Sequence, residues 1–270
     1  MKYETYAPHP ELEAFVKFYW TLEVPFDPQN KKQKIIPDGC IEMTFNFEDG
    51  IKRYISEEDF VVHPRAMVMG QRTKSYFIEP LGNVNSFAVC FYPYGFTNFV
   101  NTPLKDLVDA ELPISQLFDE KEAKDLEEGM INADSTDDRI QIINTFLLSK
   151  LRNQSTIENI VQSTVDALIA TGGSTSIGEM PQDESSKRRQ LERKFKDQIG
   201  LSPKQLGKVI RLQAALNLML NKSEKFTGIA YESEYFDQSH FIKDFKEFTG
   251  ITPKEFIGSE NMSLAKLFYK

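Results

Sequence analysis

The stretch FKDQIGLSPKQL at residues 195–206 recurs fifty positions later as FKEFTGITPKEF at residues 245–256. The offset is constant along the whole stretch, and the upstream apolar residues Leu191 and Phe241 match in the same register. Self-similarity at a fixed offset indicates one supersecondary unit used twice. The C-terminal part of the chain is therefore predicted to contain two copies of one structure.

Each copy of the repeat predicts a helix, a stop and a second helix. In the second copy, Phe241 and Phe245 form an i, i+4 apolar pair on one helical face. Gly250 follows where the helix should end, because glycine tolerates the left-handed backbone of a C-cap. Thr252 and Pro253 then supply an N-cap and a first helical residue. The first copy carries the same signals at Leu191, Phe195, Gly200, Ser202 and Pro203.

A short helix and a tight turn are predicted just before the second copy. Residues 227–231, TGIAY, favour a short helix with Thr227 as its cap, and Asp237 is placed to cap the longer helix that holds Phe241. A short helix, a turn and a longer helix make up the helix-turn-helix pattern. In such a unit the second helix enters the major groove of DNA.

The outward faces of the two longer helices are rich in hydrogen-bond donors. Arg and Gln read guanine and adenine edges through paired hydrogen bonds, whereas Lys and Ser mostly hold phosphates. A single charged helix face is usually only solvated, but two repeated and capped helices with such faces favour nucleic-acid binding. The candidates are Lys187, Arg188, Arg189, Gln190, Arg193 and Lys194 in the first copy, and Gln238, Ser239, His240 and Lys243 in the second.

The first hundred residues have the period-two alternation of half-buried strands. Apolar residues alternate at 18–24, 41–47 and 87–91, and turn signals such as Asp49-Gly50 separate these runs. Several such strands predict an antiparallel sandwich or small barrel. Aromatic residues in these runs belong to the core or line a pocket: Trp20, Phe45, Tyr76, Phe87 and Tyr92.

Helical periodicity replaces the strand pattern after about Pro113. Residues 140–151 place isoleucines and leucines on one face, and residues 155–158, STIE, form a capping box before an apolar stripe that ends at Gly172-Gly173. These helices either pack on the strands or form a dimer contact. Residues 172–176, GGSTS, are the expected linker to the C-terminal part.

Composition limits the kind of protein. The 270 residues have a net charge of −8, but residues 174–270 hold 16 Lys and Arg against 13 Asp and Glu, so the excess of acid lies in the N-terminal part. No apolar run is long enough to span a membrane, and the first residues do not resemble a secretory signal. Two cysteines, Cys40 and Cys90, make neither a disulfide framework nor a four-cysteine zinc site. A reducing cytoplasm is the expected location.

Residues 230–256, AYESEYFDQSHFIKDFKEFTGITPKEF, closely resemble the signature of the AraC family of bacterial transcriptional regulators. The resemblance extends back through RLQAALNLML at 211–220, which is similar to the family's linker helix, to RRQLERKFKDQIGLSPKQL at 188–206. It implies two recognition helices in successive segments of the major groove. Carried over by position, it implies base reading by Arg189, Glu192 and Arg193, and by Gln238, Ser239, His240 and Lys243.

The N-terminal segments IIPDGCIEMTFNF at 35–47 and FAVCFYPYGFTNF at 87–99 resemble the cupin-like sensor domains of this family. The resemblance implies an α+β multidomain protein without a cofactor: a cupin-like β sensor domain at 1–112, a helical linker or dimerisation region at 113–171, and an all-α DNA-binding domain at 174–270. Double-stranded DNA is the expected partner, with a small-molecule effector of unidentified structure. RNA polymerase and a second copy of the chain stay open as partners, as does the choice between activator and repressor.

The first unit departs from the family pattern. Pro181 and Glu184 stand inside the expected scaffold helix, where a proline costs about 3 kcal/mol. Ser185 and Glu234 replace the turn glycine of the two units, at about 1 kcal/mol where a left-handed backbone is kept. We therefore expect residues 177–186 to be poorly ordered without DNA.

Three other functions fit parts of the sequence. A regulator with degenerate DNA binding that acts through protein contacts fits the weakened first unit. A cupin-type enzyme is disfavoured because only His9 and His63 remain as metal ligands, with Glu42 or Glu79 to assist, so we expect no catalysis. A thiol sensor would need a low-pKa thiolate at Cys40 or Cys90.

Overall fold

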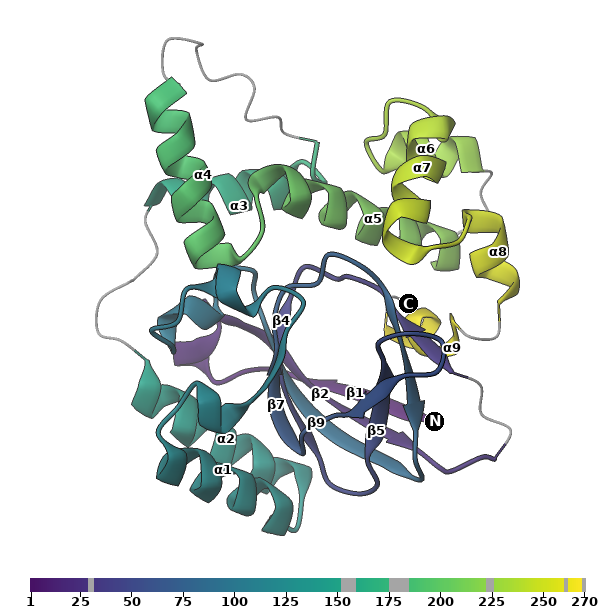
Figure 1. Cartoon of the computed structure of the whole chain (residues 1–270). Coiled ribbons are helices and arrows are strands. Elements are labelled where there is room, and N and C mark those ends of the chain that lie inside the picture. The colour runs from purple at the N-terminus through teal and green to yellow at the C-terminus, as the bar shows by residue number, and fades with distance from the viewer. Residues whose placement is uncertain (29–31, 152–158, 175–184, 222–225, 260–261, 269–270) are drawn as a thin grey trace.

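Two antiparallel sheets form the N-terminal part of the chain (Figure 1). The computed structural model describes residues 1–28, 32–151, 159–174, 185–221, 226–259 and 262–268, with the backbone alone at 185–188. The six-stranded sheet has the order β1 (Lys2–Tyr6), β2 (Val16–Val24), β9 (Val84–Phe91), β4 (Ile41–Asn46), β7 (Ala66–Met69) and β10 (Glu111–Pro113). The four-stranded sheet has the order β3 (Gln33–Ile35), β8 (Tyr76–Pro80), β5 (Ile51–Tyr54) and β6 (Phe60–Val62).

The predicted alternation is confirmed in β2, β4 and β9, and it separates two cores. Trp20 and Leu22 belong to the core between the two sheets. Their neighbour Tyr19 belongs instead to the core on the other face of the six-stranded sheet, together with Phe45 and Phe87. Because successive side chains of a strand point to opposite faces, one sheet serves both cores.

Two helices cover the outer face of the six-stranded sheet (Figure 1): α1 (Glu120–Asn132) and α2 (Thr136–Lys150). Leu126, Met130, Ile143 and Leu147 are buried there, so part of the predicted helical stripe is a core stripe. Asp119 caps α1 and Ser135 caps α2 through their side-chain oxygens. Four short 3-10 turns complete this part: η1 (Pro10–Leu12), η2 (Phe96–Asn98), η3 (Leu104–Leu107) and η4 (Ile114–Gln116).

The C-terminal helices share a third core. They are α3 (Asn159–Ala170), α4 (Ser185–Ile199), α5 (Pro203–Asn221), α6 (Phe226–Glu232), α7 (Gln238–Thr249), α8 (Pro253–Gly258) and α9 (Ser263–Phe268). Most of the buried side chains of α3 to α8 form one cluster centred on Phe195, Phe241, Phe245 and Phe256. The expected combination of an antiparallel β part and an all-α C-terminal part is thereby confirmed.

Helix α3 packs with the C-terminal helices rather than with α1 and α2. Its Val161, Val165 and Leu168 belong to the third core, whereas Ile160 and Ile169 of the expected stripe are exposed. The capping box predicted at residues 155–158 and the last two residues of the linker at 172–176 lie outside the described residues. The domain limits drawn from the sequence stay predictions.

The helical part rests on one end of the two sheets (Figure 1). Gln213 of α5 donates a hydrogen bond to the carbonyl of Pro37, and Lys34 of β3 donates to the carbonyl of Thr249 at 2.7 Å. Lys105 pairs with Asp197 at 2.8 Å. Helix α9 returns to β3, where Ser263 donates to the Gln33 side chain at 2.6 Å. Among the described helices, none has the length and apolar character needed to cross a membrane.

Candidate functional site

Helix α4 presents the donor face that the first repeat predicts. Leu191 and Phe195 are buried in the helical core. On the exposed side of this helix, Arg189 and Arg193 lie one helical turn apart. The other described candidates on α4 are Gln190 and Glu192, which are exposed, and Lys194, which is half-buried. Lys187 and Arg188 belong to α4, but their side chains lie outside the description.

Helix α7 repeats this arrangement with complete caps. The Asp237 side chain accepts a hydrogen bond from the His240 backbone N–H at 2.7 Å, so the predicted N-cap is confirmed. Phe241 and Phe245 are fully buried, while Ser239 and Lys243 are exposed. The helix therefore has one face in the core and one face available to a ligand.

Two candidates on α7 already have partners within the protein. The Thr227 hydroxyl donates to the Gln238 side-chain oxygen at 2.9 Å, so Thr227 is a residue of α6 that holds Gln238 rather than the expected cap. His240 Nε2 lies 3.6 Å from Asp244 Oδ2, and its ring meets Tyr235 edge to face. Both candidates are held at the N-terminal end of α7.

Asp244 is a buried anchor that sequence reasoning missed. Its side chain is 2% exposed and pairs with Lys208 Nζ of α5 at 3.1 Å. It therefore ties α7 to the long helix between the two units. A polar residue one turn after His240, on the buried side of the apolar stripe, was the available signal.

The N-terminal ends of α4 and α7 lie on the side of α5 away from the sheets (Figure 1). Their C-terminal ends reach the β part, where Asp197 pairs with Lys105 and the Thr249 carbonyl accepts from Lys34.

The turn before α7 keeps the left-handed backbone, with Glu234 at φ 59°. Ser185 is instead the first residue of α4. The scaffold-helix segment with Pro181 and Glu184 falls at 175–184, outside the described residues, so its expected disorder stays a prediction.

Two exposed aromatic side chains, one on α6 and one in the turn before α7, were not predicted. Phe236 is 93% exposed and Tyr231 is 84% exposed, more than any other large hydrophobic residue in the described part. Phe236 directly precedes the Asp237 cap. Apolar residues off the buried stripe were the only sign of them in the sequence.

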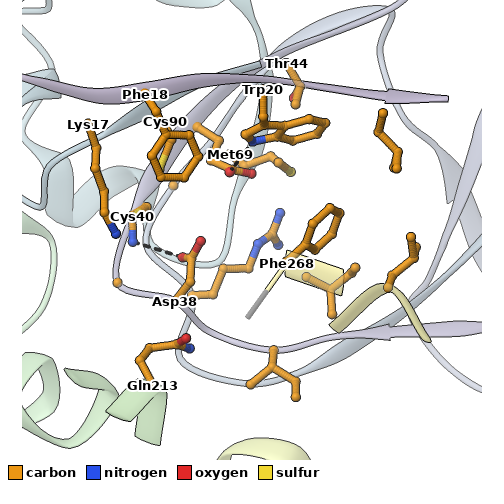
Figure 2. A pocket seen from close by; sticks show the side chains of 18 of the residues that line it. Lys17, Phe18, Trp20, Asp38, Cys40, Thr44, Met69, Cys90, Gln213 and Phe268 are labelled. Atoms are coloured by element: carbon orange, nitrogen blue, oxygen red, sulfur yellow. Dashed lines mark hydrogen bonds between the residues drawn. The ribbon is translucent and has the colours of Figure 1, made fainter. Parts of the chain in front are cut away.

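A cavity of about 440 Å³ lies between the two sheets and is closed by the helical part. Of the aromatic residues considered from the sequence, Trp20, Tyr76 and Tyr92 line it, whereas Phe45 and Phe87 lie in the core on the other face of the six-stranded sheet. Figure 2 shows side chains from the sheets, α5 and α9 meeting around this space: Trp20, Asp38, Gln213 and Phe268.

Two half-buried carboxyl groups, Asp38 and Glu42, line the cavity. Trp20 Nε1 donates to Glu42 Oε1 at 2.9 Å, and the Cys40 backbone N–H donates to Asp38 Oδ1 at 2.9 Å. Burial, reinforced by the nearby charge of Asp38, raises the pKa of Glu42 to about 8. Burial likewise raises the pKa of Asp38. Neither group forms an ion pair with another described residue.

A third buried acid, Glu111, is fully paired. Arg72 contacts it at 2.7 Å, His63 at 3.2 Å and Arg53 at 3.3 Å. Burial favours the neutral form of Glu111, but the hydrogen bond and charge of His63, with the charges of the two arginines, outweigh it and lower its pKa to about 2. His63 therefore pairs with Glu111, an acid that was not among the metal ligands considered from the sequence, His9, His63, Glu42 and Glu79. Among the described residues, no three His, Cys, Asp or Glu side chains come together as metal ligands.

Both cysteines are buried beside the cavity. A hydrogen bond with Cys40, together with burial, holds the pKa of the Cys90 thiol well above its ordinary value. A reactive thiol needs a lowered pKa. This environment therefore argues against the thiol sensor considered from the sequence.

Two family models match separate parts of the chain. Residues 4–113 match a domain of unknown function, DUF6597, and residues 184–259 match a helix-turn-helix domain. Among curated proteins, none matches the chain.

Solved structures with similar chains include those of ToxT and of the C-terminal domain of AraT. ToxT from Vibrio cholerae is 14% identical, with 91% of this chain and 99% of that chain covered and a TM-score of 0.46. ToxT bound to (E)-4-(8-methylnaphthalen-1-yl)but-3-enoic acid is 12% identical, with 96% and 99% covered and a TM-score of 0.45. The C-terminal domain of AraT, a response regulator from Geobacillus stearothermophilus, is 22% identical, with 37% and 85% covered and a TM-score of 0.31.

Proposed function

We propose that the chain, which matches a helix-turn-helix domain at residues 184–259 and resembles the AraC family there, regulates transcription by binding specific DNA sequences. The observation that carries the proposal is the pair of helices α4 and α7. Each buries an apolar stripe in the helical core and has exposed, donor-rich side chains on its remaining surface. Two such helices fit successive segments of the major groove.

The proposed contacts divide by chemistry. Arg189 and Arg193 carry paired donors suited to guanine, and Gln238 carries a donor and an acceptor suited to adenine, whereas Ser239 and Lys243 are suited to phosphates. The remaining members of the proposed face are Lys187, Arg188, Gln190, Glu192, Lys194 and His240. Gln238 is already oriented by Thr227, so it loses less side-chain freedom when it binds.

Fluorescence anisotropy with a labelled duplex from upstream of the protein's own gene tests this proposal. We expect tighter binding to that duplex than to a scrambled one, and a steep loss of affinity as salt rises. Arg193→Ala should weaken binding by about 1–3 kcal/mol and reduce discrimination between the duplexes. Lys243→Ala should weaken binding to both duplexes alike and reduce the salt slope by about one.

Lys124→Ala is the matched control, because Lys124 is exposed on α1, far along the chain from the proposed face. Its affinity and salt slope should equal those of the unmodified protein. Equal, weak and salt-insensitive binding to both duplexes would overturn the proposal. That result would favour the alternative, a regulator that acts through protein contacts, for which the exposed Tyr231 and Phe236 offer an apolar surface.

We further propose that the cavity between the sheets holds a small-molecule effector. Its walls come from both sheets and from helices α3, α5 and α9, so one ligand would contact the β part and the helical part together. Occupancy would thereby bias how the two parts sit against each other, which is the physical requirement for control of DNA binding.

A further inference from the structure

The cavity contains two carboxyl groups, Asp38 and Glu42, that form no ion pair within the described part of the protein. One oxygen of Glu42 accepts from Trp20 and one oxygen of Asp38 accepts from the Cys40 backbone, which uses half of each group's acceptor oxygens. Both side chains line the cavity, and Figure 2 shows Asp38 at its wall. A carboxyl group removed from water without a counter-ion is costly, so these two groups favour a positively charged neighbour.

The cations near the cavity are engaged elsewhere or hydrated. Arg72 is 7% exposed and binds Glu111 at 2.7 Å while it stacks 4.2 Å from the centre of the Tyr76 ring. Lys17 lines the edge of the cavity, and its side chain is exposed to solvent. The charges of both cations act on Asp38 and Glu42, but among the described residues neither cation forms an ion pair with these acids.

The other walls suit an apolar body with a polar head. Thr44 is 4% exposed and lines the cavity, yet its hydroxyl has no hydrogen-bond partner in the described part. That hydroxyl is free to meet a ligand. Aromatic rings from both sheets and from α9 line the cavity, and the faces of such rings attract cations. These rings belong to Tyr3, Phe18, Trp20, Tyr76, Tyr92 and Phe268.

We infer that the cavity binds an organic cation, in which an ammonium group sits beside Asp38 and Glu42 and an apolar body packs among the aromatic rings. The inference rests on the effector role proposed above and adds the chemical class of the effector. A bound cation would favour the ionised form of both carboxyl groups, pair with them and contact the ring of Trp20, whereas a ligand carboxylate would gain no such pairing and would be repelled by either group when it is ionised.

Trp20 provides the readout, because it is the only tryptophan of the chain and lines the cavity. Its fluorescence is titrated with phenylbutyl-trimethylammonium, with the uncharged tert-butyl isostere of that ion, and with the phenylalkanoate of the same length. We expect the cation to bind at least about tenfold more tightly than the isostere, and the carboxylate to bind most weakly.

Charge-removing variants test the two acids directly. Glu42→Gln and Asp38→Asn keep the shape of each side chain and should weaken binding of the cation by about tenfold or more, while binding of the isostere stays within about twofold. Glu23→Gln is the matched control, since Glu23 is an exposed acid of β2, the strand that carries Trp20. It should leave all three affinities unchanged.

Three results would overturn the inference: tightest binding of the carboxylate, equal binding of cation and isostere, or no binding of any probe. Far-UV circular dichroism shows whether each variant is folded, and a variant that unfolds is replaced by titration of the unmodified protein at rising salt. DNA affinity is measured separately by anisotropy. A chain that binds DNA but no cation contradicts this inference alone, whereas a chain that binds the cation but no DNA contradicts only the proposed regulatory function.

Discussion

Glu234 adopts a backbone conformation that suits glycine, with φ 59° in the turn between α6 and α7. Its N–H donates to the Tyr231 carbonyl at 3.1 Å, and the Tyr235 N–H donates to the Ala230 carbonyl at 3.0 Å, so the turn is fixed by hydrogen bonds. Glu234→Gly should therefore raise the free energy of unfolding by about 0.5–1 kcal/mol, as measured by urea denaturation.

The control for this prediction is Gln141→Gly on the exposed side of α2, where the backbone is helical. That change should lower the free energy of unfolding by up to about 1 kcal/mol. A loss of stability from both substitutions would mean that the left-handed turn costs nothing in the folded protein.

Glu42 links stability to pH. Its folded pKa of about 8 lies above the ordinary value of 4.5, so the folded protein keeps a proton that the unfolded chain releases between these values. The stabilising contribution is complete below pH 4.5 and is lost as pH rises toward 8. The Glu42→Gln variant has no such loss. The difference between its free energy of unfolding and that of the unmodified protein should therefore grow in favour of the variant between pH 5 and 8, by at most about 1.4 kcal/mol per pH unit.

Thermal unfolding of both proteins across this pH range gives the measurement. The groups that act on Glu42 are Asp38 before β4, Lys17 and Trp20 on β2, and Arg72 after β7. The pKa of Asp38 is raised in the same direction, so Asp38→Asn should give a parallel trend. A stability difference that is constant with pH would contradict the raised pKa of Glu42.

At the scale of elements, each copy of the internal repeat contains the end of one helix and the start of the next. Gly200 and Gly250 both have positive φ, and the N–H of each donates to a carbonyl four residues earlier at 2.9 Å. The next helix begins each time with a reciprocal cap, Ser202 with Gln205 and Thr252 with Glu255. Because these hydrogen bonds join residues a few positions apart, the sequence predicted correctly where both helices end and where both following helices begin.

The packing of α3 on α5 could not be predicted from the sequence. A Cβ atom on Gly173 would lie 2.2 Å from the Gly207 carbonyl oxygen, so the two backbones touch where side chains would separate them. Arg211 donates to the Gly173 carbonyl at 2.7 Å. The sequence marked Gly173 as a helix stop only, because the close approach depends on a helix more than thirty residues away.

For the whole molecule, the joint between the β part and α7 depends on Lys34. This side chain is 8% exposed, burial lowers its pKa, and its ammonium donates to the Thr249 carbonyl at the C-terminal end of α7. A cation at that end also favours the helix dipole. Lys34→Met keeps the stem and removes the bond, so amide exchange should quicken at Ser75, whose N–H donates to the neighbouring Phe248 carbonyl at 3.0 Å.

Lys32→Met is the control, because Lys32 donates instead to the Glu57 carbonyl within the β part. It should leave exchange at Ser75 unchanged, and neither substitution should alter exchange in α4. Unchanged exchange at Ser75 in Lys34→Met would show that the apolar contacts of the joint suffice without this bond.

The sequence by itself determined the features that depend on near neighbours along the chain. The alternation of strands, the apolar stripes of helices, the caps and the glycine stops all depend on residues a few positions apart. They therefore predicted the strands, the two repeated helices and the exposed helix faces that carry Arg193 and Lys243. Tertiary structure alone decided the cavity, where Trp20 of β2, Asp38 and Glu42 near β4, and Phe268 of α9 meet. Their chemistry depends on exclusion from water, and burial arises only when segments distant in sequence pack together.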